Sequence, residues 1–437
     1  SDERRAAIKR EGGVSKLITL LDGSNLEGVE KEELKGIDLP NEHEMSGMNE
    51  QAAATLAELA LNNAEMQDSI IEAGSVPHLL VLIRTGSPHG QEYAARAIRN
   101  LVTFQPIDAA LIENQNLCVE CGTISDLVQL TKTGSQEAQL LAAAGISELA
   151  SGAVYEREMM DKNREEAEKR SRRASRDRGQ IEAIVSNIKR QESKGGGLSR
   201  RASKEEEKKD RLVLIAEAGG IVPLVSMLST QSDLARENAA GALMHLALDK
   251  ANATAIASAQ GILPLVTLLD QGTEQAHKHA AEALLRLCAG NADNQTQSSK
   301  HLVGLLSKGV GTQCRTARVL SEVAKNNPGS PVIIVNAGAI SPLVNLLGFG
   351  VLDVKIEVAG ALQNPSLNSP DTQLAIATGL VHLLRQVEDS VTHEHVTRLL
   401  LTLVNDPTNC AAVSRTEAVQ RLIHQLRSGT STASVQE

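Results

Sequence analysis

The sequence predicts an all-α protein built as a solenoid, in which short helical repeats stack on one another. Three observations predict this fold class. Of the 437 residues, 41% are hydrophobic, yet the chain has no Trp, two Phe and two Tyr, so aliphatic side chains and Ala must form the core. A short segment that ends in Gly recurs about every 40 residues, the sign of an internal repeat. Between these segments, apolar residues follow the helical spacing i, i+3, i+4 and i+7.

Composition excludes several other classes. A β-sandwich or barrel normally contains more aromatic and β-branched residues. The formal net charge of −10 argues against a general nucleic-acid-binding protein, which needs a basic surface. The sequence has no apolar run long enough to span a membrane and no secretory signal at its start. Five cysteines in so long a chain indicate a reducing compartment instead of a disulfide framework. We therefore expect a cytoplasmic protein, with a nuclear or cytoskeletal location as the alternative.

Each repeat is predicted to begin with a short helix that stops at a Gly and continues into a second helix. The Gly supplies the left-handed residue that ends the first helix. A Pro in the first turn of the second helix costs nothing, because the N–H groups there have no partner inside the helix. The clearest copies run from Ile71 to Leu80, Ala216 to Val225, Gln260 to Val266 and Asn336 to Val344. Weaker copies begin at Gly13, Gly122, Ser299, Gly379 and Glu417.

A third, amphipathic helix completes each repeat. Residues 239–247 and 280–287 show its pattern, and polar residues such as those of 229–233 provide the cap before it. The spacing from Gly220 to Gly261 is 41 residues, and 77 residues from Gly261 to Gly338 fit two shorter units. Because one triplet of helices cannot bury its own apolar face, neighbouring triplets must stack.

These segments resemble the armadillo repeat, in which an Ala-Gly-x-Ile-x-Pro-Leu-Val segment is followed by an Ala-Ala-Gly-Ala-Leu segment. Nine second helices and eight third helices can be counted across nearly the whole chain. HEAT repeats are the nearest alternative, but their units have two helices and no short first helix that ends in Gly. The resemblance implies a right-handed superhelix of about nine repeats, with the third helices on its concave side, and it is typical of cytosolic or nuclear eukaryotic proteins.

Two insertions interrupt the period and divide the chain. An acidic segment at 23–45 is predicted to be a surface loop, which a solenoid tolerates easily. The larger insertion, 155–211, holds 18 of the 44 Lys and Arg and 13 of the 54 Asp and Glu, so it carries +5 and leaves −15 on the rest. We expect residues 1–154 to form repeats 1–3, residues 155–211 to form a flexible, partly helical arm, and residues 212–437 to form repeats 4–9.

The arm contains two copies of Ser-Arg-Arg-Ala-Ser, which end at Ser175 and Ser203. They resemble substrates of basophilic kinases, and phosphorylation of both serines would offset the excess positive charge of the arm. Such runs also arise by chance in basic segments. A short apolar face, formed by Ile181, Ile184, Val185 and Ile188, could bind the solenoid or a partner.

No residues indicate catalysis, a cofactor or a metal. Cys118 and Cys121 have the spacing of half a metal or redox site, but no second pair accompanies them. The pairs His277/His279 and His393/His395 are two residues apart, so on a helix they point to different faces and cannot easily share a metal. We expect a protein that is not an enzyme.

The resemblance implies that partner segments bind along the third helices. In family members that bind extended peptides, such as importin-alpha, each third helix carries a clamping Asn with a Trp one turn earlier. The corresponding positions here are Glu58, Asn100, Glu148, His245, Arg286, Glu322, Asn364 and Thr402. Since only two are Asn and the chain has no Trp, we do not expect a receptor for nuclear-localisation signals.

The most direct functional interpretation is a scaffold or adaptor that binds protein segments, basic ones among them, along this groove. Its partners would be other proteins or the chain's own arm, attracted by the opposite charges of arm and body. The alternatives are a solvated groove that binds nothing, a constitutive subunit of a large cytoskeletal or flagellar assembly, and a regulatory part of an enzyme whose catalytic part lies elsewhere.

Overall fold

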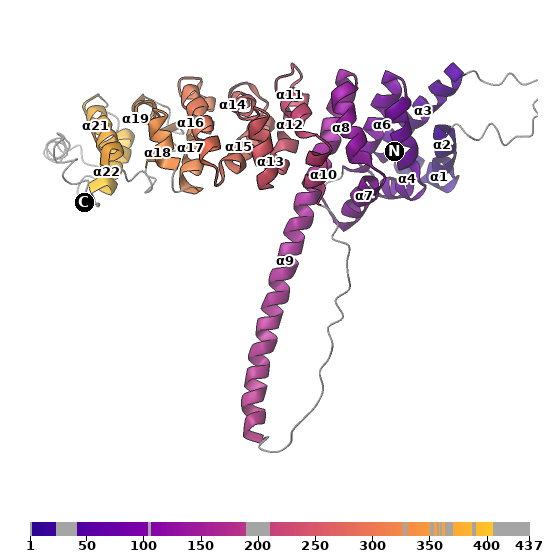
Figure 1. Cartoon of the computed structure of the whole chain (residues 1–437), viewed down its shortest axis with the longest axis horizontal. Helices are drawn as coiled ribbons and strands as arrows, with labels where there is room; N and C mark the ends of the chain where they lie inside the picture. Colours follow the sequence, from indigo (N-terminus) through magenta and orange to yellow (C-terminus); the bar gives the residue numbers. More distant parts are fainter. Residues whose placement is uncertain are drawn as a thin grey trace, which may run out of the picture. The chain divides into compact units, whose positions relative to one another are not determined.

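The computed structural model describes residues 2–22, 42–103, 106–188, 210–326, 330–349, 354–355, 358, 361–362, 370–386 and 390–404. Every regular element among these residues is a helix, as predicted (Figure 1). The chain divides into two compact units, Ser1–Ala218 and Gly219–Glu437. The two units are described separately below.

Unit 1 follows the predicted order of first, second and third helix. The first helices are α1 (Asp2–Arg10), α4 (Ala64–Glu72), α7 (Ala109–Glu120) and α10 (Arg211–Glu217). The second helices are α2 (Gly13–Asp22), α5 (Ser75–Thr85) and α8 (Thr123–Thr133). The third helices are α3 (Glu42–Ala60), α6 (Pro88–Leu101) and α9 (Gln136–Ile188).

Unit 2 repeats this order with shorter connections. It begins with the pair α11 (Ile221–Met227) and α12 (Asp233–Leu246). The triplet α13 (Lys250–Ser258), α14 (Ile262–Gln271) and α15 (Glu274–Cys288) follows. The following helices are α16 (Ala292–Leu305), α17 (Val310–Asn326), α18 (Ser330–Asn336), α19 (Ile340–Phe349), α21 (Pro370–Gln386) and α22 (Ser390–Val404).

The third helices lie side by side within each unit. In unit 1, α3 packs along α6 and α6 along α9, and in unit 2, α12 packs along α15 and α15 along α17. The cores between the helices are aliphatic, as the composition requires: Leu56, Ile98 and Ile146 are fully buried in unit 1, and Leu243 and Leu284 in unit 2. The same position of every repeat therefore recurs along one face of each unit.

The turns between first and second helices depend on glycine at most repeats. Gly74, Gly122, Gly219 and Gly338 have φ angles of +81°, +90°, +79° and +83°, which glycine adopts at little cost. The repeat before α14 differs, because Gln260, with a φ of +64°, takes the left-handed conformation in place of Gly261. Gly261 is needed for space instead, since a Cβ there would meet Ile256 Cγ2 at 2.8 Å.

Two of the weaker predicted turns are absent. Ser299 lies inside α16 and Gly379 inside α21, so in these repeats one continuous helix replaces the separate first and second helices. Neither residue takes the left-handed conformation that stops the first helix elsewhere. The third helix α3 also begins earlier than predicted, at Glu42, and so includes the end of the acidic insertion. Residues 23–41 of that insertion lie outside the described residues.

The predicted boundary between residues 154 and 155 falls inside a helix. α9 runs without interruption from Gln136 to Ile188, 53 residues, and its far part extends away from the other helices of unit 1 (Figure 1). A helix of this length is about 80 Å long. The third helix of repeat 3 and the first part of the predicted arm are thus one element. Residues 189–209 lie outside the described residues.

Candidate functional site

The predicted groove positions of unit 1 lie on its three adjacent third helices. Glu58 of α3 is exposed, Asn100 of α6 is buried with 4% of its surface exposed, and Glu148 of α9 is half-buried. They occupy the equivalent position of three successive repeats, and the structure brings them onto one face.

Asn100 stabilises the stack of helices. Its Nδ2 donates to the backbone oxygen of Ala57 on α3, at 2.9 Å, and its Oδ1 accepts from Nη1 of Arg99 at 3.4 Å. Both polar atoms of the amide therefore bond within the protein. Each atom has a second hydrogen-bonding position, so the contact of Asn100 with a partner stays a prediction.

Glu148 and Arg99 form the charged part of this face. Burial raises the pKa of the Glu148 carboxyl, and the positive charge of Arg99 partly opposes that rise. A basic side chain from a partner would supply further positive charge beside Glu148 and favour its ionised form. Glu58 and Glu148 are thus the two predicted positions of unit 1 whose carboxylates suit a cationic partner.

The equivalent positions of unit 2 are His245 on α12, Arg286 on α15 and Glu322 on α17. Arg286 donates from Nη1 to the backbone oxygen of Met244 at 2.7 Å and from Nε to Glu282 at 2.9 Å. Burial, together with the nearby charges of Arg286 and His279, lowers the pKa of His245 to about 4. His245 is therefore neutral at pH 7.

Two predicted positions remain without a structural account. Asn364 lies outside the described residues, and Thr402 lies in α22, where its side chain is outside them.

The two units differ in the charge of their third helices. In unit 1, α3, α6 and the part of α9 up to Ala153 carry seven acidic and two basic residues, a net charge of −5. In unit 2, α12, α15 and α17 carry five acidic and six basic residues, a net charge of +1. By sequence, the third helices of unit 1 are therefore more acidic than those of unit 2.

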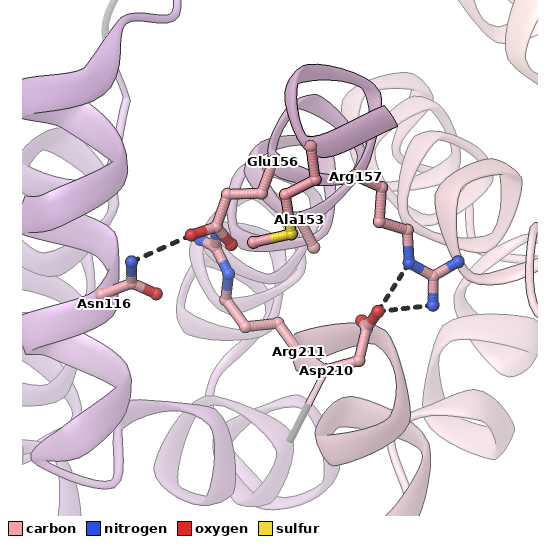
Figure 2. Close-up of a pocket in the computed structure, with 7 residues that line it drawn as sticks. Asn116, Ala153, Glu156, Arg157, Asp210 and Arg211 are labelled. Carbon is pink, nitrogen blue, oxygen red and sulfur yellow. Dashed lines mark hydrogen bonds and ion pairs between the residues drawn. The ribbon is translucent and has the colours of Figure 1, made fainter. Parts of the chain in front are cut away.

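A second polar site, which the sequence did not reveal, closes the base of the long insertion (Figure 2). Arg211, the first residue of α10, has 3% of its surface exposed and donates from Nη2 to Glu156 of α9 at 2.5 Å. The residue before it, Asp210, accepts from Nε of Arg157 at 2.5 Å and also caps α10 by accepting from the backbone N of Leu212 at 2.8 Å. Two ion pairs thus join the points where the chain leaves and re-enters the repeats. We call these four residues the base clamp.

Helix α7 anchors the base clamp from a third side. Arg211 Nη1 donates to Gln115 Oε1 at 2.5 Å, and Asn116 Nδ2 donates to Glu156 Oε1 at 3.1 Å. Gly152 of α9 leaves the space that this requires, because a Cβ there would lie 1.8 Å from Gln115 Oε1. The clamp lines a cavity of about 130 Å³ together with Asn116, Ala153 and Met160 (Figure 2).

The base clamp corrects the boundaries predicted for the arm. The sequence predicts one charged, flexible segment at 155–211, because these residues lack the repeat pattern. Glu156, Arg157, Asp210 and Arg211 instead belong to the packed part of unit 1. The sequence signal for the end of the insertion is the apolar run Leu212–Ile215, which directly follows Arg211 and starts a repeat helix.

Directly beyond the clamp, α9 is exposed to solvent over residues 158–169. The docking of the arm on the chain's own third helices stays a prediction. Ser175 lies within α9, with its side chain outside the described residues, and Ser203 lies outside them altogether.

The thiols and carboxylates of the described residues form no recognisable reactive centre. Burial raises the pKa of the Cys118 thiol to about 12 and that of Cys288 to about 11, so both stay protonated at neutral pH. No cluster of three His, Cys, Asp or Glu side chains suited to a metal occurs in the described part of the chain. No described helix is long and apolar enough to cross a membrane alone, although α13 and α14 pass that test together as a pair bent by 82°.

Comparison with known proteins identifies the repeats. Residues 63–103 and 327–364 match the family described as armadillo/beta-catenin-like repeat. No curated protein matches the chain.

Similar solved structures include an engineered protein, 24% identical, with 97% of this chain and 95% of that one covered and a TM-score of 0.45. A computationally designed armadillo repeat protein for modular peptide recognition is 19% identical, over 80% of this chain and 99% of that one, with a TM-score of 0.46. A designed armadillo repeat protein in complex with the peptide (KR)4 is 18% identical, over 81% and 99%, with a TM-score of 0.44.

Proposed function

Since the chain is an armadillo-repeat protein, we propose that it is a scaffold without enzymatic activity, whose unit 1 binds basic segments of partner proteins along α3, α6 and α9. The observation that carries this proposal is the acidic character of these three adjacent helices, with a net charge of −5. Glu58 and Glu148 are the proposed contact residues. Attraction between such a face and a basic segment favours association and is screened by salt.

Asn100 has a supporting role in this proposal. It ties α6 to the backbone of α3 through its bond to Ala57 and so fixes the position of α3, which carries Glu58, against α6. A rigid face of this kind loses little conformational entropy when a partner segment binds.

We also propose that phosphorylation of Ser175 and Ser203 regulates the scaffold. Both serines follow an Arg pair, the pattern that basophilic kinases recognise, and each phosphate would add nearly two negative charges to a basic region. The cytoplasm is the proposed location, since Cys118, Cys121 and Cys288 are free thiols.

The binding proposal is tested with a fluorescein-labelled peptide of eight alternating Lys and Arg residues, titrated with the full chain. The double variant Glu58→Gln/Glu148→Gln removes two charges from the proposed face. The matched control, Glu72→Gln/Glu113→Gln, removes two charges from exposed positions on the first helices α4 and α7. We expect the first variant to weaken binding about tenfold and the control less than about twofold.

Equal losses in both variants would show that the peptide responds only to overall charge, and the proposed face would be abandoned. A pull-down from the native source then distinguishes an adaptor from a fixed subunit. Replacing residues 161–208 by a short Gly-Ser linker removes most of the insertion but keeps the base clamp. One large complex retained by both forms would favour a constitutive structural subunit.

A further inference from the structure

The cavity lined by the base clamp contains two polar atoms that have no hydrogen-bond partner among the described residues. One is Nε of Arg211, a donor, and the other is Oδ1 of Asn116, an acceptor. Both atoms are buried, and both residues line the cavity of about 130 Å³. We call it the clamp cavity. Since buried polar groups in proteins are nearly always hydrogen-bonded, the unpartnered donor and acceptor indicate that a ligand binds here.

The two atoms lie close together because both side chains bond to the same carboxylate. Glu156 accepts from Arg211 Nη2 through Oε2 at 2.5 Å and from Asn116 Nδ2 through Oε1 at 3.1 Å. Figure 2 shows the side chains of Asn116 and Arg211 reaching this carboxylate from two different helices. Each unpartnered atom belongs to the same planar group as an atom that is bonded to Glu156. One small polar group can therefore reach both.

Neighbouring bonds hold the guanidinium of Arg211 in place. Gln115 Oε1 accepts from Arg211 Nη1 at 2.5 Å, and Gln115 Nε2 donates to the backbone oxygen of Val102 at 2.9 Å. Gly152 leaves space for this arrangement, since a Cβ there would lie 3.1 Å from Arg211 Nη1. Arg211 itself is 3% exposed. The donor is therefore fixed before a ligand binds, which lowers the entropic cost of binding.

The charges around the clamp cavity balance one another. Glu156 pairs with Arg211, and Asp210 pairs with Arg157, at 2.5 Å in each case. An anionic or cationic ligand would add an unpaired charge to this set, which is unfavourable among buried groups. A neutral ligand leaves both ion pairs intact. The electrostatics of the cavity therefore favour a neutral polar group.

The rest of the lining is apolar and reaches the surface. Ala153 is 4% exposed, whereas Met160 is 66% exposed, so the cavity opens to solvent beside Met160. The volume of about 130 Å³ is well above the roughly 10–15 Å³ that a single water needs. A ligand with a short apolar stem behind its polar group fits such a lining.

We propose that the clamp cavity binds a primary carboxamide. The carboxamide oxygen accepts from Arg211 Nε, and the carboxamide nitrogen donates to Asn116 Oδ1. This group is neutral and carries an acceptor and a donor side by side in one plane, whereas a carboxylate has no donor and an ammonium group has no acceptor. The carboxamide belongs to a small molecule or to an Asn or Gln side chain of a partner protein. The site contains neither Glu58 nor Glu148, so it is independent of the proposed binding of basic segments.

The experiment follows binding to the full chain by NMR, through isotope-labelled methyl groups of its seven methionines. The Met160→Leu variant identifies the signal of Met160. The probe is propionamide, compared with propionate, with N,N-dimethylpropionamide, which has no N–H donor, and with propanol. We expect a saturable shift of the Met160 signal with propionamide and at least about tenfold weaker binding of the other three compounds.

A variant that fills the cavity locates the binding. Ala153→Leu adds apolar volume to the lining and removes none of the polar atoms. The matched control, Ala110→Leu, adds the same group at an exposed position on α7. Both changes introduce a good helix former, and circular dichroism verifies that the helices are kept. We expect Ala153→Leu to weaken propionamide binding about tenfold or more and the control less than about twofold.

Further titrations identify the source of the carboxamide and separate the site from the proposed function. Tighter binding of acetyl-Gly-Gln-Gly N-methylamide than of propionamide, and than of the same peptide with Met in place of Gln, assigns the group to a partner protein. Binding of propionamide but of neither peptide assigns it to a small molecule. The Ala153→Leu variant should bind the Lys-Arg peptide as tightly as the unchanged chain does.

Three outcomes overturn the inference. If propionamide gives no saturable shift of the Met160 signal, water alone occupies the cavity. If propionate, the dimethyl amide or propanol binds as tightly as propionamide, the site does not recognise a carboxamide. If Ala153→Leu keeps its helices and binds propionamide with unchanged affinity, the carboxamide binds elsewhere on the chain.

Discussion

In each unit, a side chain on one third helix bonds to the backbone of the preceding third helix, but the residue that does so differs. In unit 1, Asn100 of α6 donates to the backbone oxygen of Ala57 on the preceding third helix. In unit 2, Arg286 of α15 donates to the backbone oxygen of Met244, at the corresponding place. In these two repeats a side-chain donor bonds to the preceding third helix, and the donor is neutral in one and charged in the other. The side chain at this position can therefore support the packing of the third helices whether or not it carries a charge.

A second pair of residues at equivalent positions shows how burial affects ionisable groups in the two units. Glu148 of unit 1 and His245 of unit 2 both lie half-buried on third helices. Burial raises the pKa of Glu148 and lowers that of His245, so in both cases it favours the neutral form. Burial thus disfavours the charged form in both units, although their third helices carry −5 and +1.

The largest expected effect concerns the base clamp, which only unit 1 contains among the described residues. Glu156→Gln leaves the buried guanidinium of Arg211 without its carboxylate, and we expect a loss of about 3 kcal/mol in the stability of unit 1. Hydrogen exchange, read separately for peptides of the two units, measures it. Glu158→Gln, an exposed position one residue beyond the clamp, is the control and should change little. Slower exchange in unit 1 of the Glu156 variant would contradict the role of the clamp.

The next prediction concerns the way in which the stability of unit 2 depends on pH. His245 is harder to protonate in the folded chain than in the unfolded one, with a pKa of about 4 against 6.5. The unfolded chain therefore binds more protons between these values, and the contribution of His245 to stability is lost as pH falls from about 6.5 towards about 4. We expect His245→Gln to reduce the acid-induced loss in unit 2 by about 2 kcal/mol. Exchange measured at pH 7 and at pH 4.5 checks it, with His301→Gln, an exposed histidine of α16, as control.

In the same experiment, the contribution of Glu148 to stability should change with pH in the opposite direction. Its pKa is raised in the folded chain, so the folded chain binds the extra proton and unit 1 gains stability as pH falls through that raised pKa. Glu148→Gln should remove this gain. If both variants changed the pH dependence of stability in the same direction, the opposite effects expected of His245 and Glu148 would be contradicted.

The smallest effect tests the shared donor position. Asn100→Ala removes a buried amide and should cost about 1.5 kcal/mol. Arg286→Ala should cost about 1 kcal/mol, because that side chain is 22% exposed and water replaces part of what is lost. Urea unfolding, with exchange used to assign each change to its unit, compares them. A larger cost for Arg286→Ala would show that the arginine contributes more to stability through its charge than through its bond to Met244.

Much of the architecture was present in the sequence because its signals are local. The Ala-Gly and Leu-rich pattern predicts three helices per repeat, since left-handed Gly and helical apolar spacing act over a few residues. Ser232 shows how far this goes: its predicted cap before α12 is confirmed by a bond from the backbone N of Ala235 at 3.2 Å. The pattern fails at Ser299 and Gly379, where no residue stops the first helix.

The sequence by itself determined the repeat, the aliphatic core, the acidic body and the two Ser-Arg-Arg-Ala-Ser sites, because each is a property of neighbouring residues or of composition. Only the tertiary structure decided that Asn100 bonds to Ala57, and that Arg211 meets Gln115, 96 residues earlier in the chain. These bonds depend on which helices lie side by side and on the space at Gly152. A charged residue at the end of a charged segment looks exposed in sequence, and packing alone makes Arg211 a buried one.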